Sequence, residues 1–211
     1  MERKTRKPTQ KRALEKIEKI VDAGYKLFNE KGYYNTTTAD IAKEAGVATG
    51  SVYAYFEDKK DIYLQVIRRV FDSFFPPTED FWIQNNNFNP EDHEAIKALF
   101  GSFIKLMMNY HNFSKTYHDE LEALSLLDED IGNLVNELEA SRVKKVEEIS
   151  KLVSTSFKSE EDLKIFAHYS ILLVDDVCHK ILYDDTVKDT NLYIDKCGEM
   201  LYTLFKSTTA Y

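Results

Sequence analysis

The segment AGVATGSVYAYF, from Ala45 to Phe56, combines a turn signal, small residues and closely spaced aromatic residues. Gly50 and its small neighbours allow a helix backbone to approach another surface closely. Thr and Ala can contact thymine methyl groups, and Ser or Thr hydroxyls can hydrogen-bond base edges. Tyr53 and Tyr55 are long enough to place a hydroxyl on a phosphate. These residue types at this spacing are suited to contact with DNA.

A glycine turn at Gly46 separates two short predicted helices. The first is predicted over about residues 38–45, and the second from residue 48 or 49 to about 56. Two helices joined by so short a turn are typical of a helix-turn-helix, whose second helix enters the DNA major groove. Val52 and Phe56, spaced i and i+4, are predicted to turn inward and anchor the second helix.

Two further residues extend this predicted surface. Lys59 begins the next predicted helix, where free backbone amides already favour phosphate. Thr38 begins the first helix of the pair and offers its hydroxyl in the same way. The residues predicted to contact DNA are Thr38, Thr49, Gly50, Ser51, Tyr53, Ala54, Tyr55 and Lys59.

Histidine and carboxylate residues elsewhere raise the alternative of an enzyme or a metal site. Asp175 and Asp176 share a predicted helix side with His179, which could be a metal-binding pair. An Asp–His pair of this spacing more often forms a surface salt bridge. The chain contains no HExxH, CxxC, GxSxG or glycine-rich phosphate loop. We therefore predict no catalytic residue, metal, cofactor or enzyme activity.

The composition is that of a helical globular protein with an uneven charge distribution. The chain has 211 residues, of which 43% are apolar, with only 7 Gly and 4 Pro. Residues 1–70 contain 15 basic and 10 acidic residues, whereas residues 71–211 contain 13 and 26. A basic N-terminal third on an acidic body indicates that one end binds a polyanion. The basic run at residues 1–12 is either part of that surface or a solvated tail.

Cysteine usage and hydropathy indicate the cellular setting. Cys178 and Cys197 are too few for a disulfide framework, and their apolar neighbours predict buried, inert thiols rather than redox sensors. The charged N-terminus lacks the apolar stretch of a secretory signal. The longest apolar runs, such as residues 171–174, are too short to span a bilayer. We therefore predict a cytoplasmic protein.

Helical periodicity and end signals predict an all-α chain of about nine helices without a sheet. The first helix is predicted to end at Lys31 because Gly32 follows it, and Thr37 begins a capping box for the second. Residues 76–90 are predicted to form a loop that ends in an Asn89 cap. The later helices are predicted at about 59–75, 91–111, 115–127, 129–154, 160–183 and 191–206.

The segment TTTADIAKEAGVATGSVYAYFEDKKDIY resembles the DNA-binding signature of TetR-family transcriptional regulators, over about residues 10–66. The matching features are the Thr pair, the IAKEAGV helix, the second helix with its tyrosines, and the Lys after a short acidic turn. The resemblance implies that the DNA-contact set given above, apart from Ala54, lies at the DNA, with Lys59 mostly on phosphate. This chain has Thr49 where many members have Lys or Arg, and Ala54 where an aromatic or polar residue is frequent. These departures predict a T-rich half-site, or help from the basic arm in the minor groove.

The resemblance also implies an architecture and a function. It predicts a DNA-binding domain with a basic N-terminal arm at residues 1–58, and a helical ligand-binding and dimerisation domain at 59–211. The protein is expected to be a repressor that binds a palindromic operator as a dimer and is released by a small apolar or amphipathic effector. The predicted helix at 59–75 links the two domains and is the expected lever. The alternative is a ligand-dependent coregulator that acts through a partner protein rather than by direct DNA binding.

Two features of the acidic part agree with that architecture. The predicted helix at 160–183 is apolar on two faces, so residues 160–206 are predicted to form a homodimer interface, unless this is an ordinary central helix of an all-α core. Aromatic and methionine residues crowd the middle helices, which indicates either an apolar ligand pocket or simply core. The residues predicted to bind ligand are Phe103, Met107, Tyr110, Tyr117, His118 and Tyr169.

Overall fold

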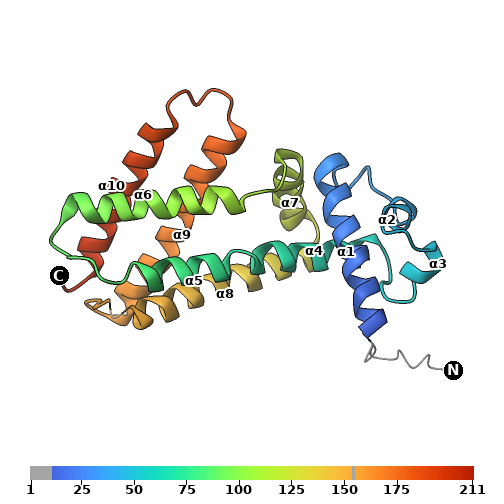
Figure 1. Ribbon diagram of the computed structural model, residues 1–211, viewed down its shortest axis with the longest axis horizontal. Coiled ribbons are helices and arrows are strands. Elements are labelled where there is room, and N and C mark those ends of the chain that lie inside the picture. The colour runs from blue at the N-terminus through green and yellow to red at the C-terminus, as the bar shows by residue number, and fades with distance from the viewer. Residues whose placement is uncertain (1–10, 154) are drawn as a thin grey trace. The chain divides into compact units, whose positions relative to one another are not determined.

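The computed structural model describes residues 11–153 and 155–211. Over these ranges it contains ten α-helices and no β-strand, apart from one isolated bridge between Phe157 and Thr209. The all-α prediction is therefore confirmed (Figure 1). The predicted basic arm at residues 1–12 lies outside the described residues except for Lys11 and Arg12, which begin the first helix. None of the helices within the described ranges is long and apolar enough to cross a bilayer.

The helix bounds follow the predicted ones closely over most of the chain. The helices are α1 (Lys11–Lys31), α2 (Thr38–Glu44), α3 (Thr49–Val52), α4 (Lys59–Asp72), α5 (Phe75–Gln84), α6 (His93–Tyr110), α7 (Lys115–Leu127), α8 (Glu129–Leu152), α9 (Glu160–Tyr183) and α10 (Thr190–Thr208). The additional helix, α5, falls where the sequence predicts a loop.

The prolines after α4 explain why α5 was not predicted. Pro76 and Pro77 cannot continue α4, but they lie in the first turn of α5, where a missing N–H is tolerated. The predicted loop at 76–90 is therefore wrong as far as Gln84. The predicted cap of the following helix is also wrong, because Asp92 rather than Asn89 caps α6.

Helix ends in the N-terminal part follow the local signals. Thr37 caps α2 with the predicted box: its hydroxyl accepts a hydrogen bond from Asp40 N at 3.1 Å, and Asp40 accepts one from Thr37 N at 3.0 Å. Gly32 and Gly46 adopt positive φ angles of 82° and 67° after α1 and α2. Both glycines therefore provide turns that other residues adopt only with strain.

The helices group into two compact units. The first contains residues up to Val70 together with 113–135, and the second contains 71–112 together with 136–211. The first unit thus includes most of α4 and all of α7, which the division predicted after residue 58 assigns to the other domain. The predicted division into a DNA-binding domain and a ligand-binding domain stays a prediction, since the compact units do not show what each part binds.

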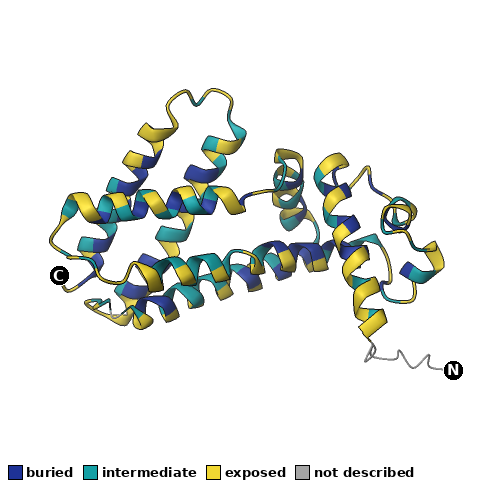
Figure 2. Ribbon diagram, viewed as in Figure 1, coloured by how far each residue is buried: buried dark blue, intermediate teal, exposed yellow. Residues whose placement is uncertain are grey.

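The core of the first unit is built from the apolar faces of α1, α2 and α4. Buried and exposed positions alternate along α1, as on an amphipathic helix (Figure 2). A Cβ on Gly24 of α1 would lie only 2.9 Å from Ile62 Cγ2, so this glycine allows α1 and α4 to approach closely. The fully buried side chains of this core include Ile20, Phe28, Ile41, Val52, Ile62, Val66 and Ile67.

In the second unit, α6, α9 and α10 pack against one another around an apolar core. The predicted inner face of α9 is buried there, whereas its second apolar stripe is exposed. Tyr169 and Leu172 are 52% and 50% exposed, and Met200 on α10 is 49% exposed. Leu201, next to Met200, is fully buried and belongs to the core instead.

Candidate functional site

The predicted DNA-contact surface lies on α3 and the turn that follows it. α3 spans only four residues, and the Val52 carbonyl then accepts hydrogen bonds from Tyr55 N at 2.9 Å and Phe56 N at 3.0 Å. The predicted helix to residue 56 is therefore about one turn too long. Val52 and Phe56 are buried, which confirms that they anchor this segment.

The residues around these two anchors, from Thr49 to Tyr55, are otherwise exposed or half-buried. A Cβ on Gly50 would meet no other atom within 4 Å, so packing inside the unit does not require this glycine. Thr38, at the first position of α2, is half-buried. The exposed predicted residues are Thr49, Gly50, Tyr53 and Ala54, and the half-buried ones are Ser51 and Tyr55. The structure therefore gathers six of the eight predicted contacts on one short segment.

Lys59, at the start of α4, is held by uncharged groups. Its Nζ donates a hydrogen bond to the Tyr33 carbonyl at 2.6 Å and lies 4.1 Å from the centroid of the Tyr33 ring. Burial lowers the pKa of Lys59, and the negative charge of Glu120 partly offsets that effect. Among the described residues Lys59 forms no direct ion pair, although the charge of Glu120 acts on it.

The Tyr33 backbone is itself fixed by α7. Glu120 on α7 accepts a hydrogen bond from Tyr33 N and lies against Gly32, where a Cβ would come within 2.5 Å of Glu120 Oε1. Ser114, the cap of α7, donates to Asn29 through its backbone and its hydroxyl, both at 2.7 Å. Sequence analysis missed these contacts because 85 to 87 residues separate the partners.

Lys60 differs from its neighbour Lys59 in its partners. The Lys60 Nζ pairs with Asp130 and, at 3.4 Å, with Asp128, which lie at the start of α8. The hydrogen bond to Asp130 contributes most to raising the pKa of Lys60. Lys60 is therefore paired with carboxylates within the first unit, whereas Lys59 forms no direct ion pair among the described residues.

The second unit contains an apolar cavity bounded by α5, α6, α8, α9 and α10. The volume of this cavity is about 110 Å³. Its aromatic lining consists of Phe74, Phe75, Trp82, Phe88, Phe100, Phe103, Phe157, Phe166 and Phe205. Its polar lining consists of Thr78, Arg142, Lys145, Ser150, Thr155, Ser170 and Asp175. Apolar walls with a few polar groups are typical of small-molecule sites.

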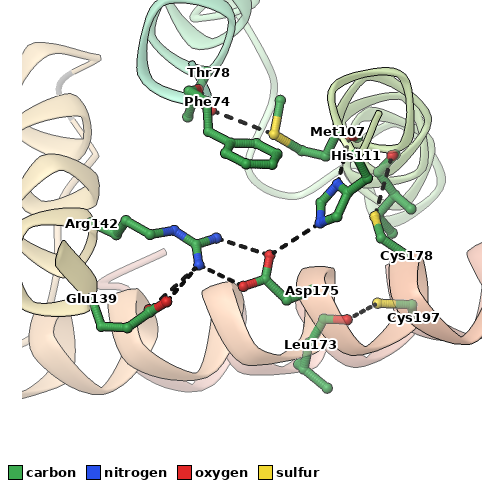
Figure 3. A network of polar contacts seen from close by, with 11 residues as sticks. Phe74, Thr78, Met107, His111, Glu139, Arg142, Leu173, Asp175, Cys178 and Cys197 are labelled. Atoms are coloured by element: carbon green, nitrogen blue, oxygen red, sulfur yellow. Dashed lines mark hydrogen bonds and ion pairs between the residues drawn. The ribbon is translucent and has the colours of Figure 1, made fainter. Parts of the chain in front are cut away.

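An ion-pair network forms the polar wall of this cavity (Figure 3). Arg142 binds Asp175 with two hydrogen bonds, of 2.6 Å from Nη1 and 2.9 Å from Nη2. Arg142 Nη1 also donates to Glu139 at 3.1 Å. Burial opposes ionisation of Asp175, but the charge and hydrogen bonds of Arg142 outweigh it and lower the pKa of Asp175. Asp175 is therefore ionised at neutral pH.

His111 lies beside the Arg142–Asp175 pair. Its Nδ1 donates to the Met107 carbonyl at 2.8 Å, and since a carbonyl only accepts, Nδ1 carries a proton. Its Nε2 lies 3.9 Å from Asp175 Oδ1. The interpretation of Asp175 as part of a surface pair is wrong as to its position, because its side chain is 22% exposed and its carboxylate faces Arg142. Within the described ranges no cluster of three or more His, Cys, Asp or Glu could hold a metal ion.

The six residues predicted to bind ligand separate into two groups. Phe103 and Met107 line the cavity. Tyr110 and Tyr169 are exposed and do not line it. Tyr117 and His118 belong to the first unit, where Tyr117 is buried in the core and His118 lies 3.4 Å from Asp119. None of these four residues lines the cavity.

The sequence offered a partial signal for the lining residues that were missed. Trp82 and Thr78 line the cavity from α5, a segment that is predicted to be a loop because of its two prolines. Arg142 lies on a predicted helix, but nothing in its local pattern distinguishes it from surface arginines. A helical reading of residues 75–84 would have revealed the aromatic stripe of α5.

The two cysteines are buried in the second unit, as predicted. Cys178 Sγ donates to the Ile104 carbonyl at 3.9 Å, and Cys197 Sγ donates to the Leu173 carbonyl at 3.5 Å. Burial raises the pKa of Cys197 to about 11 and raises that of Cys178 further above its ordinary value. Thiols in this state are poor nucleophiles at neutral pH.

Comparison with known proteins supports the helix-turn-helix assignment. Residues 20–66 match the family described as bacterial regulatory proteins, tetR family. The chain is 34% identical over 123 residues to a fatty acid metabolism regulator protein of Bacillus subtilis, covering 58% of this chain and 60% of that protein. It is 28% identical over 122 residues to IcaR of Staphylococcus epidermidis, a negative transcriptional regulator of a biofilm operon, covering 57% and 62%. The chain thus spans about three fifths of the length of each relative.

A solved structure extends the similarity of fold beyond that segment. A candidate TetR-family transcriptional regulator from Mesorhizobium loti superposes with a TM-score of 0.70 at 16% sequence identity. The superposition covers 94% of this chain and 98% of the other. Such low identity shows the shared fold alone. The chain thus contains the DNA-binding region of the tetR family of bacterial regulatory proteins at residues 20–66.

Proposed function

We propose that this chain is a repressor that binds a palindromic DNA operator as a homodimer and is released by a small apolar or amphipathic effector. The observation that carries the proposal is the exposed segment of α3, together with Lys59 on the same unit, which forms no direct ion pair among the described residues. The family match at residues 20–66 supports DNA binding, and the negative regulator IcaR among the relatives supports repression.

The proposed DNA contacts divide by what each side chain can reach. Thr49, Gly50, Ser51 and Ala54 are small and face the groove, where Thr and Ala favour contact with thymine methyl groups. The phosphate contacts are Thr38, Tyr53, Tyr55 and Lys59, which position the helix without selecting a sequence. α3 contains no Lys or Arg to bind guanine with two hydrogen bonds, so we expect a T-rich half-site.

The dimer is supported by the exposed apolar stripe of α9 and α10. Tyr169, Leu172 and Met200 would lose contact with water if a second copy covered them. A two-fold symmetric dimer would present two α3 segments to two half-sites. We therefore place the interface within residues 160–206.

The cavity of the second unit is the proposed effector site. An effector that binds more tightly to a dimer whose α3 segments do not match the half-sites lowers the affinity for the operator. The size of this effect is limited by the difference between the effector's affinities for the matching and the non-matching dimer. α4 is the proposed link, because its residues belong to the first unit as far as Val70 and to the second unit beyond it.

Footprinting on DNA from the gene's own upstream region tests the proposal. The purified chain is titrated at several salt concentrations with unrelated DNA as competitor. We expect a two-fold symmetric footprint that survives the competitor, with an affinity that falls as salt rises. Equally weak binding to every DNA would contradict the repressor function and favour the coregulator that acts through a partner protein.

A further inference from the structure

The polar wall of the cavity holds two cations, Arg142 and Lys145, and one carboxylate, Asp175. Arg142 is neutralised by Asp175 and also binds Glu139. The second cation of the lining, Lys145, pairs with Glu79 at 2.8 Å and with Glu148 at 3.7 Å. Neither cation is therefore left without a carboxylate partner, although Glu139, Glu79 and Glu148 do not line the cavity.

The position of the Arg142–Asp175 pair makes it unavailable for an anionic ligand. The side chains of Arg142 and Asp175 are only 16% and 22% exposed, and both line the cavity. The guanidinium carbon lies over the rings of Phe71 and Phe74, 5.9 Å from each centroid. A ligand carboxylate would have to displace Asp175 from this pair or enter an apolar space without a counter-ion, and both are costly.

Hydrogen-bond donors remain available for an uncharged group. A guanidinium has five N–H donors, and the contacts with Asp175 and Glu139 use three of them. The hydroxyl-bearing residues Ser150 and Thr155 also line the cavity. An oxygen that accepts hydrogen bonds without bearing a charge can thus be satisfied, while the aromatic walls surround an apolar chain.

We propose that the cavity selects an apolar molecule with an uncharged, hydrogen-bond-accepting head group and rejects carboxylates of the same chain length. Asp175 is the residue that sets this selectivity, because it occupies Arg142. The inference rests on the proposed role of the cavity as the effector site, and it adds the chemical class of the effector.

Trp82 provides a direct readout of cavity occupancy. It is the single tryptophan of the chain and it lines the cavity. Decanol, decanoate and decylammonium share one chain length and differ in head-group charge. Titrating each compound into the full-length protein while following Trp82 fluorescence gives three dissociation constants without DNA. We expect decanol to bind at least about tenfold more tightly than either charged compound.

The variant Asp175→Asn tests whether Asp175 causes the selectivity against carboxylates. The alternative is that any apolar site prefers an uncharged molecule. Asn keeps the size of Asp and removes the charge that occupies Arg142. We expect decanoate affinity to rise about tenfold relative to decanol. Asp176→Asn is the matched control, since Asp176 is adjacent, exposed and absent from the lining, and it should leave that ratio unchanged. If Asp175→Asn does not fold, Glu139→Gln removes the other carboxylate on Arg142 and should shift the ratio in the same direction.

The outcomes distinguish this inference from the proposed function. Tighter binding of decanoate or decylammonium than of decanol by the natural chain would overturn the selectivity while leaving the cavity as the effector site. Equal ratios for Asp175→Asn and Asp176→Asn would overturn the role of Asp175. No fluorescence response to any compound would overturn both the effector site and its selectivity.

Discussion

Lys59 in the first unit and Arg142 in the second are partly buried cations that lie against aromatic rings, but their partners differ. Lys59 binds a backbone carbonyl, which is neutral. Arg142 binds two carboxylates, which cancel its charge. A cation oriented by neutral groups keeps its attraction for an external anion, whereas a cation paired with carboxylates supports the fold. Residue type alone therefore does not show which cations bind a ligand.

Removing the paired cation should have the largest effect. Arg142→Met leaves Asp175 and Glu139 without a counter-ion, so we expect the free energy of unfolding to fall by about 3 to 5 kcal/mol at pH 7. Arg69→Met is the control, because Arg69 is 48% exposed and pairs with Asp22 on the surface. That control should lose less than about 1 kcal/mol in urea unfolding. Equal losses for the two variants would contradict the distinction.

The contribution of the Arg142–Asp175 pair should depend on pH in one direction. Because the folded pKa of Asp175 lies below its ordinary value, the stabilisation is present at neutral pH. It is lost as the pH falls through the folded pKa of Asp175. The stability difference between the natural chain and Arg142→Met should therefore shrink below about pH 4. Urea unfolding across a pH series measures this, and a difference that stays constant would argue against the pair.

The exposed leucines of the two units should differ in their effect on assembly. Leu172→Glu places a charge in the proposed interface, so we expect the dimer dissociation constant to rise roughly a hundredfold. Leu126→Glu, on α7 of the first unit, is the matched control, since Leu126 is 82% exposed. Sedimentation over a concentration series measures both variants. A Leu172→Glu chain that dimerises like the natural one would place the interface elsewhere.

Substitution of the two glycines with positive φ angles, Gly32 and Gly46, tests the contact between Glu120 of α7 and the turn after α1. Gly32→Ala introduces backbone strain and a clash with Glu120, so we expect a loss of about 2 kcal/mol in urea unfolding. Gly46→Ala introduces similar strain with no atom nearby and should lose about 1 kcal/mol. If the two losses are the same, Glu120 is not pressed against Gly32 in solution.

The adjacent lysines provide the finest comparison. Lys59→Ala should weaken DNA binding about tenfold for all sequences alike and lower the salt slope by about one. Lys60→Ala removes a cation that Asp128 and Asp130 already balance, so the salt slope should stay nearly unchanged. Binding isotherms at several salt concentrations measure both slopes. A sequence-selective loss in Lys59→Ala would contradict a phosphate contact.

Sequence reasoning was most accurate where neighbours along the chain decide the structure. The Thr37 capping box, the turns at Gly32 and Gly46 and the inward Val52 and Phe56 are confirmed. It failed at α5, because proline ends one helix and also begins another, and only packing decides between the two. The proposed DNA contacts came from a local motif, whereas four of the six residues predicted to bind ligand do not line the cavity.

The sequence by itself determined the helical class, most helix ends and the composition of the α3 surface, because these depend on residues within a few positions of one another. The tertiary structure decided which charges are balanced. Lys60 pairs with Asp128, and Arg142 pairs with Asp175, although each pair is far apart in the sequence. It also decided which aromatic residues surround the cavity, because helices from distant parts of the chain meet there. Charge balance and cavity shape are properties of contacts between helices, and a one-dimensional pattern does not specify them.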